Sequence, residues 1–273
     1  MKILECSSIR DQELIKLKQN IKENLTLAII QIGHFEENDL YLRSKRKLAQ
    51  ELNINLLEIV FDETNSKEEI INNITSLNNN PDITGIIIQK PILKEFNYQE
   101  LVNHIDYKKD IDGVTQKNQN RLKANLPSLI PCTARSVLKV FDYYQIPLIN
   151  QKITILGKSP LSGLPLYHIL LNNNLNVTLC DSKTINTKEI IKSSDIIIST
   201  IGKPNYFDNS YFTKDQILID VGTNYLDGKL VGDIDFNSLD NSISMITPVP
   251  GGIGRLTPLY LFINLIEASN LKK

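Results

Sequence analysis

The sequence predicts an α/β fold built from two α/β domains. Short hydrophobic runs alternate along the chain with longer amphipathic segments, a pattern typical of parallel sheets covered by helices. A polar, irregular stretch over residues 107–129 separates two such series. The length of 273 residues is enough for one large or two ordinary domains. We therefore expect two α/β units joined by a functional connection.

Composition limits the classes of partner. The chain has 30 basic and 31 acidic residues, so its charge indicates neither nucleic acid nor an anionic membrane as a partner. Cys6, Cys132 and Cys180 are far apart and form no CxxC pair, which argues against a zinc site or a disulfide framework. No apolar run approaches the ~20 residues of a membrane span, and the first residues lack the apolar core of a signal peptide. We expect a cytoplasmic protein.

The N-terminal unit is predicted to be a parallel sheet with its helices. Strands are expected over residues 25–32, 54–61 and 83–89. An amphipathic helix over residues 38–52 follows the first strand, with Asn38 or Asp39 as its cap. Ser66 and Glu69 have the spacing of a capping box and start the next helix.

The C-terminal unit is predicted to open with a long helix, capped by Thr133 and ending near residue 144. Strands are expected over residues 152–156, 176–180, 195–199, 216–220 and 244–246. A last helix over residues 257–269 closes the chain.

The turn after residues 152–156 has the features of an anion site. Gly157 permits a tight turn and Gly163 permits close packing of a helix on the strand. Backbone N–H groups at a helix start favour phosphate. The next strand ends at Asp181, Ser182 and Lys183, about 20 residues further on, where dinucleotide folds contact the ribose. The spacing is not G-x-G-x-x-G, so a plain strand–turn–helix connection remains the alternative.

A second set of candidates lies in the N-terminal half. Tyr41 and Lys45 fall on one helix face, where a phenol and an amine can move protons or orient a substrate. A solvated helix with a basic run is the alternative. Gln89 ends a strand, where ligands of parallel sheets bind. Asp110 and Asp112 share a loop that can present one acid to a ligand.

A proline- and glycine-rich segment, residues 247–254, precedes the last helix. Its two prolines fix φ, and its three glycines allow conformations closed to other residues. Such a loop suits close backbone approach to a flat ligand, although an ordinary turn would also explain it.

Taken in order, eight segments resemble the bifunctional methylenetetrahydrofolate dehydrogenase/methenyltetrahydrofolate cyclohydrolase family. The matching segments are YLRSK (41–45), GIIIQKP (85–91), KDIDG (109–113), PCT (131–133), GKSPLSGLP (157–165), DVGTN (220–224), GKLVGDIDF (228–236) and TPVPGGIG (247–254). Each segment alone is a weak signal, but eight in the family's order are specific.

The resemblance implies a particular domain layout. Residues 1–130, completed by a C-terminal helix over about 255–273, would form the folate-facing catalytic domain. Residues 131–254 would form a Rossmann-like NAD(P)-binding domain, entered by a linking helix. The two domains would flank a cleft that holds the active site. The family also implies tetrahydrofolate substrates and a homodimer formed through the nicotinamide domain.

The resemblance also assigns roles to the candidate residues. Lys45 would be the catalytic lysine, tuned by Gln89, while Tyr41 would pack against the folate and Asp112 would hold the pterin ring. The loop at Pro250, Gly251 and Gly252 would lie beside the nicotinamide and the folate. No residue is assigned to a metal.

The cofactor would bind at seven positions: Gly157, Lys158, Ser159, Asp181, Ser182, Lys183 and Thr223. Lys158 stands where the family often has an arginine that holds the 2′-phosphate of NADP. Asp181 favours NAD, because an acid there accepts from the ribose hydroxyl. We expect NADP, with NAD possible, because two lysines and a serine surround one aspartate.

The sequence departs from the family at Ala134-Arg135-Ser136, where a proline and a glycine are usual, at Arg255-Leu256, and at Lys90, where an apolar residue is common. These departures remove no proposed catalytic residue.

The sequence leaves two alternatives to the bifunctional enzyme: a monofunctional dehydrogenase and a non-catalytic dinucleotide-binding protein.

Overall fold

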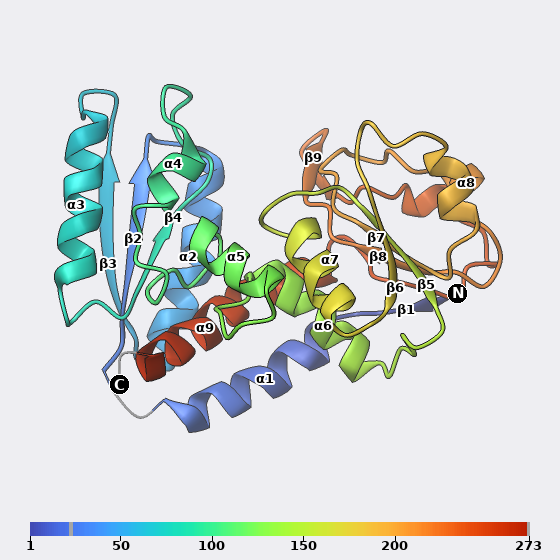
Figure 1. Cartoon of the computed structure of the whole chain (residues 1–273), viewed down its shortest axis with the longest axis horizontal. Helices are drawn as coiled ribbons and strands as arrows, with labels where there is room; N and C mark the ends of the chain where they lie inside the picture. Colours follow the sequence, from blue (N-terminus) through green and yellow to red (C-terminus); the bar gives the residue numbers. More distant parts are fainter. Residues whose placement is uncertain (22–23, 272–273) are drawn as a thin grey trace. The chain divides into compact units, whose positions relative to one another are not determined.

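The computed structural model describes residues 1–21 and 24–271, without the side chains of residues 37–41. The chain forms two compact units (Figure 1). We call them the small-sheet unit and the large-sheet unit. The small-sheet unit contains Leu14–Arg121, Pro127–Ile130 and Leu261–Lys273. The large-sheet unit contains Met1–Glu13, Leu122–Leu126 and Pro131–Tyr260.

The described residues of the small-sheet unit form a three-stranded parallel sheet in the order β3-β2-β4. Its strands are β2 (Thr26–Ile32), β3 (Asn55–Phe61) and β4 (Gly85–Ile88). The central strand β2 is almost wholly buried, as expected of a strand with neighbours on both sides and helices over the sheet. Its helices include α2 (Glu36–Leu52), α3 (Lys67–Asn79) and α4 (Tyr98–Val102), while α1 (Ser7–Asn20), α5 (Gln116–Lys123) and α9 (Thr257–Leu271) are shared with the other unit.

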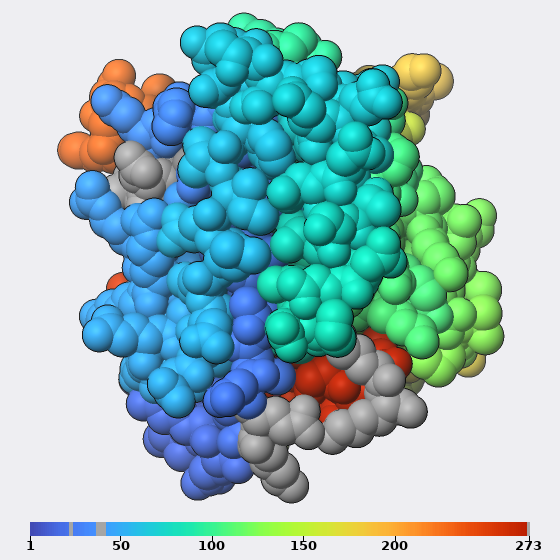
Figure 2. Space-filling view, turned by 90° about the vertical axis from the view of Figure 1, so that its left-hand side faces the viewer, coloured from blue at the N-terminus to red at the C-terminus, as the bar shows by residue number. Residues whose placement is uncertain are grey.

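Strand β3 is an edge of this sheet, and with α3 it forms much of the face shown in Figure 2. Leu57 and Val60 on β3 are exposed, whereas Phe61 at its end is buried. The exposed edge explains why the hydrophobic pattern of β3 is weaker than that of β2.

The described residues of the large-sheet unit form a six-stranded parallel sheet in the order β1-β11-β8-β7-β5-β6. Its strands are β1 (Lys2–Ile3), β5 (Lys152–Leu156), β6 (Asn176–Cys180), β7 (Ile196–Ser199), β8 (Ile217–Asp220) and β11 (Met245–Ile246). The order reverses between β5 and β7, and ligands of such sheets bind beyond the carboxyl ends of the strands at this reversal. A separate hairpin pairs β9 (Asn224–Leu226) with β10 (Lys229–Val231).

The helices of this unit include α6 (Cys132–Tyr143), α7 (Gly163–Asn172) and α8 (Thr187–Lys192), with 3-10 turns η1 (Asn209–Tyr211), η2 (Phe236–Ser238) and η3 (Ile253–Arg255). One part of the core joins Leu156, Ile197 and Leu218 from three strands with Phe207 and Phe212 from a loop. This packing fixes the strand ends from which the candidate cofactor loops start.

Several sequence expectations need correction. Helix α2 begins at Glu36 with Phe35 as its cap, not at Asn38 or Asp39. Helix α6 begins at Cys132 after Pro131, so Thr133 lies inside the helix. The stretch over residues 107–129 is not wholly irregular, because α5 lies within it. In contrast, the capping box of Ser66 and Glu69 is confirmed.

The division into units differs from the expected layout, residues 1–130 completed by a C-terminal helix from about residue 255, at both ends of the chain. The first residues belong to the large-sheet unit, because β1 pairs with β11 and extends its sheet. The return to the small-sheet unit occurs after Tyr260, inside α9, rather than near residue 255. Two-residue strands such as β1 are too short to give a hydrophobic pattern, so the sequence carried no signal for this exchange.

Candidate active site

Lys45 and Gln89 contact each other at the carboxyl end of the small sheet. Lys45 lies on α2, and its Nζ donates to Gln89 Oε1 at 2.5 Å. Gln89 follows β4 and is 8% exposed. Its Nε2 donates to the backbone oxygen of Lys90 at 2.7 Å, and its backbone N–H donates to Ile30 O at 2.8 Å. The amide is therefore held on both ends, and its oxygen fixes the position of the half-buried lysine amine.

Tyr41 is one helical turn before Lys45 on α2. Its side chain lies outside the described part of the structure, so its predicted stacking on a folate stays a prediction.

The two acids of the 109–113 loop have different environments. Asp110 is buried and accepts from Val114 N at 3.2 Å, Thr115 N at 2.8 Å and Asn118 Nδ2 at 2.8 Å. Burial raises the pKa of Asp110, and these hydrogen bonds oppose the rise. Asp110 therefore stabilises the conformation of the loop through these buried hydrogen bonds. Asp112 is less buried and is the acid of this pair that a ligand can reach more readily.

Lys90 and Tyr98 lie close to Asp112, a grouping that was not predicted from the sequence. Lys90 Nζ is 3.9 Å from the centroid of the Tyr98 ring, a cation–π distance. Partial burial lowers the pKa of Lys90, and attraction to the Asp112 carboxylate opposes that change. Burial raises the pKa of Tyr98 strongly, with Asp112 and Asp110 adding to the rise. The unusual Lys90 therefore adds a positive charge beside the predicted pterin-binding acid.

In the large-sheet unit, the turn after β5 has the backbone that the sequence predicted. Gly157 has φ of +101°, a conformation that favours glycine. A Cβ at Gly163 would overlap the backbone oxygen of Gly157, and Thr200 also lies against both glycines. Helix α7 therefore packs directly on the turn, and its N-terminus follows the carboxyl end of β5. This geometry is suited to an anionic group.

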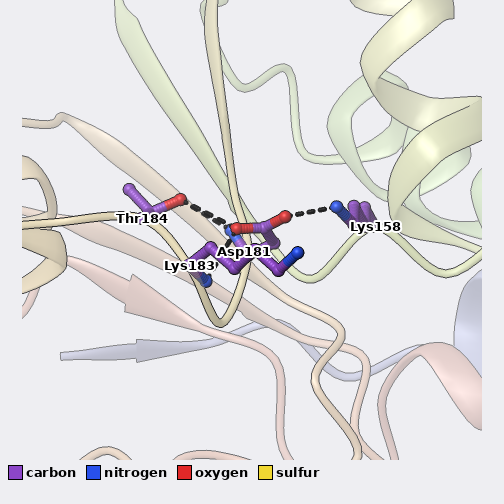
Figure 3. Close-up of polar contacts among 4 residues, drawn as sticks. All are labelled: Lys158, Asp181, Lys183 and Thr184. Carbon is purple, nitrogen blue, oxygen red and sulfur yellow. Dashed lines mark hydrogen bonds and ion pairs between the residues drawn. The ribbon is translucent and has the colours of Figure 1, made fainter.

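Asp181 and Lys158, the two charges that point to different cofactors, form an ion pair (Figure 3). Asp181 Oδ2 accepts from Lys158 Nζ, while Oδ1 accepts from Lys183 N at 2.9 Å and Thr184 Oγ1 at 3.3 Å. The hydrogen bond from Lys158 lowers the pKa of Asp181 to about 2. The charge that would repel a 2′-phosphate is therefore partly neutralised. Thr184 was missed by sequence reasoning.

The remaining predicted residues lie on loops of the same unit. Ser159 Oγ accepts from Leu161 N at 3.2 Å inside the turn. Ser182 is exposed beside Asp181, and Thr223 is exposed after β8. Gly251, between Pro250 and Gly252, accepts from Cys6 N at 3.0 Å, which ties the proline- and glycine-rich loop to the segment after β1. The structure thus places all of them after the carboxyl ends of parallel strands.

No group of three or more His, Cys, Asp or Glu side chains in residues 1–21 and 24–271 has an arrangement that would hold a metal ion. No helix in this part of the chain is long and apolar enough to cross a membrane.

The chain matches two family models. Residues 4–112 match the catalytic domain of tetrahydrofolate dehydrogenase/cyclohydrolase, and residues 131–273 match the NAD(P)-binding domain of the same family. The gap between the matches contains the α5 segment.

Individual relatives agree with the models along nearly the whole chain. The bifunctional protein FolD of Picrophilus torridus is 37% identical over 271 residues, covering 97% of this chain and 97% of that protein. The FolD of Clostridium beijerinckii is 36% identical over 265 residues, covering 93% and 94%.

Solved structures show the same agreement. The bifunctional 5,10-methylenetetrahydrofolate dehydrogenase/cyclohydrolase of Thermoplasma acidophilum is 34% identical, with a TM-score of 0.93 and 99% of both chains covered. The FolD of Campylobacter jejuni is 29% identical, with a TM-score of 0.95 and full coverage of both chains. The expected family and its NAD(P)-binding domain are confirmed: this chain belongs to the tetrahydrofolate dehydrogenase/cyclohydrolase family.

Proposed function

We propose that this enzyme catalyses two consecutive reactions: it oxidises 5,10-methylenetetrahydrofolate to the 5,10-methenyl form with NADP, and then hydrolyses that product to 10-formyltetrahydrofolate. The observation that carries the proposal is the hydrogen bond from Lys45 Nζ to Gln89 Oε1 at 2.5 Å. This hydrogen bond supports the role of Lys45 in the hydrolytic step, because that step requires an amine held in place by a neutral partner.

The dehydrogenase step needs alignment more than acid–base chemistry. A hydride leaves the one-carbon bridge of the folate, and the remaining positive charge spreads over the two flanking nitrogens. The bound nicotinamide supplies the hydride acceptor. We assign Asp112 and Tyr41 to holding the folate, because fixing the donor carbon at the acceptor accounts for most of the rate.

The cyclohydrolase step needs a proton acceptor. Water attacks the methenyl carbon, loses one proton, and the ring opens at one carbon–nitrogen bond to leave the formyl group. We assign Lys45 to taking the proton from the water and returning a proton to the departing nitrogen. A cationic substrate nearby favours the neutral amine. Gln89 can orient that amine without adding a charge that would oppose this effect.

The large-sheet unit fits a dinucleotide. Its Gly157 turn and the start of α7 suit the pyrophosphate, and the exposed Ser182 and Lys183 directly follow Asp181. We propose NADP as the preferred form, because Lys158 already neutralises Asp181 in part and can turn to a 2′-phosphate. Thr223, Pro250, Gly251 and Gly252 are assigned to the same side of the sheet as further contacts.

A parallel assay tests this function. The purified chain is given 5,10-methylenetetrahydrofolate with NADP or NAD, and the reduced nicotinamide is followed by absorbance. We expect faster reduction of NADP. Equal or faster reduction of NAD would overturn the cofactor assignment, and reduction of neither would overturn the dehydrogenase. Reduction with accumulation of the methenyl product would instead favour the monofunctional dehydrogenase.

We also propose a homodimer formed through the large-sheet unit, in the cytoplasm. Tyr225 and Leu226 on β9 are 53% and 41% exposed, and Tyr206 and Phe236 are exposed on the same unit. Two neighbouring exposed apolar side chains on a hairpin outside the main sheet, Tyr225 and Leu226, support a protein contact there. The three widely spaced cysteines support a reducing, cytoplasmic location.

A further inference from the structure

Asp233, which follows β10, is a completely buried carboxylate with four hydrogen-bond donors around it. Its Oδ2 accepts from Ser199 Oγ and from Ile201 N, each at 2.8 Å. Its Oδ1 accepts from Lys203 N and from Asn224 Nδ2, each at 3.0 Å. A carboxylate has about four acceptor positions. The protein therefore uses the whole side chain to hold neighbouring segments.

These donors lie at the end of β7 and on the loop after it, and at the start of β9, which the loop after β8 leads into. One loop follows β7, which ends at Ser199, and the other follows β8, which ends at Asp220. Both start at the carboxyl edge, where parallel sheets bind their ligands. The second loop carries Thr223, one of the positions assigned to the cofactor. Asp233 thus sets the spacing between two loops at the candidate cofactor site without belonging to either.

A second buried carboxylate extends the same network. Asp220 accepts from Gly222 N at 2.9 Å, from Asp233 N at 3.0 Å and from Ile234 N at 2.9 Å. Its backbone N–H donates to Thr247 Oγ1 at 2.7 Å, and Thr247 begins the proline- and glycine-rich loop. The network therefore joins the loops after three parallel strands.

The backbone packs directly against both carboxylates at two glycines. A Cβ at Gly222 would meet the Asp233 carboxylate, and a Cβ at Gly232 would meet the Asp220 carboxylate. Gly222 therefore packs against Asp233, and Gly232 packs against Asp220. This close packing, together with the hydrogen bonds, holds the backbone of these loops in place.

We propose that Asp233 is a positioning residue for the dinucleotide: it holds residues 199–203 and 220–224 in the arrangement that receives the cofactor. Asp233 acts through the loops and does not touch the cofactor itself. The inference rests on the proposed function, because that function places NADP at this edge of the sheet.

The test is Asp233→Asn, with Asp215→Asn as a matched control. An amide has one acceptor oxygen, and its NH2 group would face donors such as the backbone N–H of Lys203, which cannot reverse. Asp215 is exposed at the opposite end of β8, with φ of +68°, which asparagine tolerates. We expect Asp233→Asn to weaken NADP binding about tenfold, from the loss of charged hydrogen bonds. Asp215→Asn should leave NADP binding unchanged.

The rate of the hydrolytic step distinguishes a specific effect on the cofactor loops from a general loss of structure. Hydrolysis of 5,10-methenyltetrahydrofolate consumes no dinucleotide, so Asp233→Asn should keep its rate within about twofold. An unchanged dissociation constant for NADP would overturn the proposal. A fall in hydrolysis by the same factor as the fall in NADP affinity would overturn it too, because the role would then be purely structural.

A second variant and a direct binding measurement distinguish the remaining outcomes. If Asp233→Asn fails to fold, Ser199→Ala removes a single donor, and it should raise the dissociation constant for NADP about threefold; no change would overturn the proposal. NADP binding is measured by calorimetry without folate. A wild-type chain that binds NADP but leaves folate unchanged would therefore contradict the proposed function, while the comparison of variants still tests Asp233.

Discussion

At the scale of single residues, a neutral amide beside the candidate catalytic amine is the informative feature. Gln89 is buried and held at both ends of its amide, so its oxygen can fix Lys45 without adding charge. A carboxylate in the same place would hold the lysine in its protonated form. The pairing with an amide favours a lysine that can accept a proton.

Lys45→Met should lower the rate of methenyl hydrolysis at least about a hundredfold, the usual effect of losing a general base. NADP binding should be unchanged, because Lys45 and the cofactor turn belong to different units. Lys47→Met is the matched control, since Lys47 is an exposed lysine on the same helix. Hydrolysis is followed by the loss of methenyl absorbance. If it survives in Lys45→Met, the role given to Lys45 is wrong.

Asp181→Ser should raise the preference for NADP over NAD. The change removes a ribose acceptor for NAD and releases Lys158 from its ion pair to meet a 2′-phosphate. Lys158→Ala should shift the preference in the opposite direction. The measurement is the ratio of kcat/KM with the two cofactors for each variant. An unchanged ratio in both variants would show that this pair does not select the cofactor.

At the scale of helices and strands, the sequence predicted which elements exist better than where they begin. Strands β5, which is buried after its first residue, and β6, which alternates between exposed and less exposed positions, contain β-branched residues and were placed correctly. The start of α2 was wrong because no side chain caps it, so the cap signal fell on later polar residues. Short elements such as β1 and α4 were missed, since so few residues give no period.

The same reasoning explains what was found and missed in the candidate site. The family resemblance implied the pairing of Lys45 with Gln89, whereas the sequence pattern alone placed Lys45 on a helix face and Gln89 at a strand end. The contacts of Tyr98, at the start of α4, and of Thr184, on a loop, were not predicted, because they depend on the path of the chain around the packed sheet. The Lys158–Asp181 ion pair was not predicted, because sequence reasoning treated Lys158 as favouring NADP and Asp181 as favouring NAD. Only the structure shows that the two side chains contact each other.

Ser66→Ala tests the one cap that the sequence and the structure share. Ser66 Oγ accepts from Glu69 N at 3.2 Å, and Glu69 Oε2 accepts from Ser66 N at 2.7 Å. Losing the serine should lower the free energy of unfolding by about 1 kcal/mol. Ser76→Ala, at an exposed position inside the same helix, should not lower it. Urea denaturation measures both, and equal effects would contradict the capping role.

At the scale of the whole molecule, the chain exchanges its ends between the two units. The N-terminal strand β1 extends the large sheet, and the end of α9 belongs to the small-sheet unit. Asn264 on α9 donates to Ile111 O at 2.7 Å and to Ile130 O at 2.8 Å. The last helix thereby supports the loop that carries Asp112, so a truncation there should disturb folate binding before cofactor binding.

The proposed homodimer is tested with Leu226→Glu. A buried charge at the interface between copies would oppose association, so this variant should elute as a monomer while the wild-type chain elutes as a dimer. Leu57→Glu, on the exposed edge strand of the other unit, is the control and should remain dimeric. The measurement is light scattering after size-exclusion chromatography. A wild-type monomer, or a dimer in both variants, would contradict the assigned surface.

The central claim is that one chain performs both reactions, and the stoichiometry of its products tests that claim most directly. The wild-type chain is incubated with 5,10-methylenetetrahydrofolate and NADP, and NADPH and 10-formyltetrahydrofolate are quantified in the same samples against a sample without enzyme. We expect the two products to form in equal amounts. NADPH that accumulates with the methenyl form, while 10-formyltetrahydrofolate stays at the level of the sample without enzyme, would contradict a bifunctional enzyme.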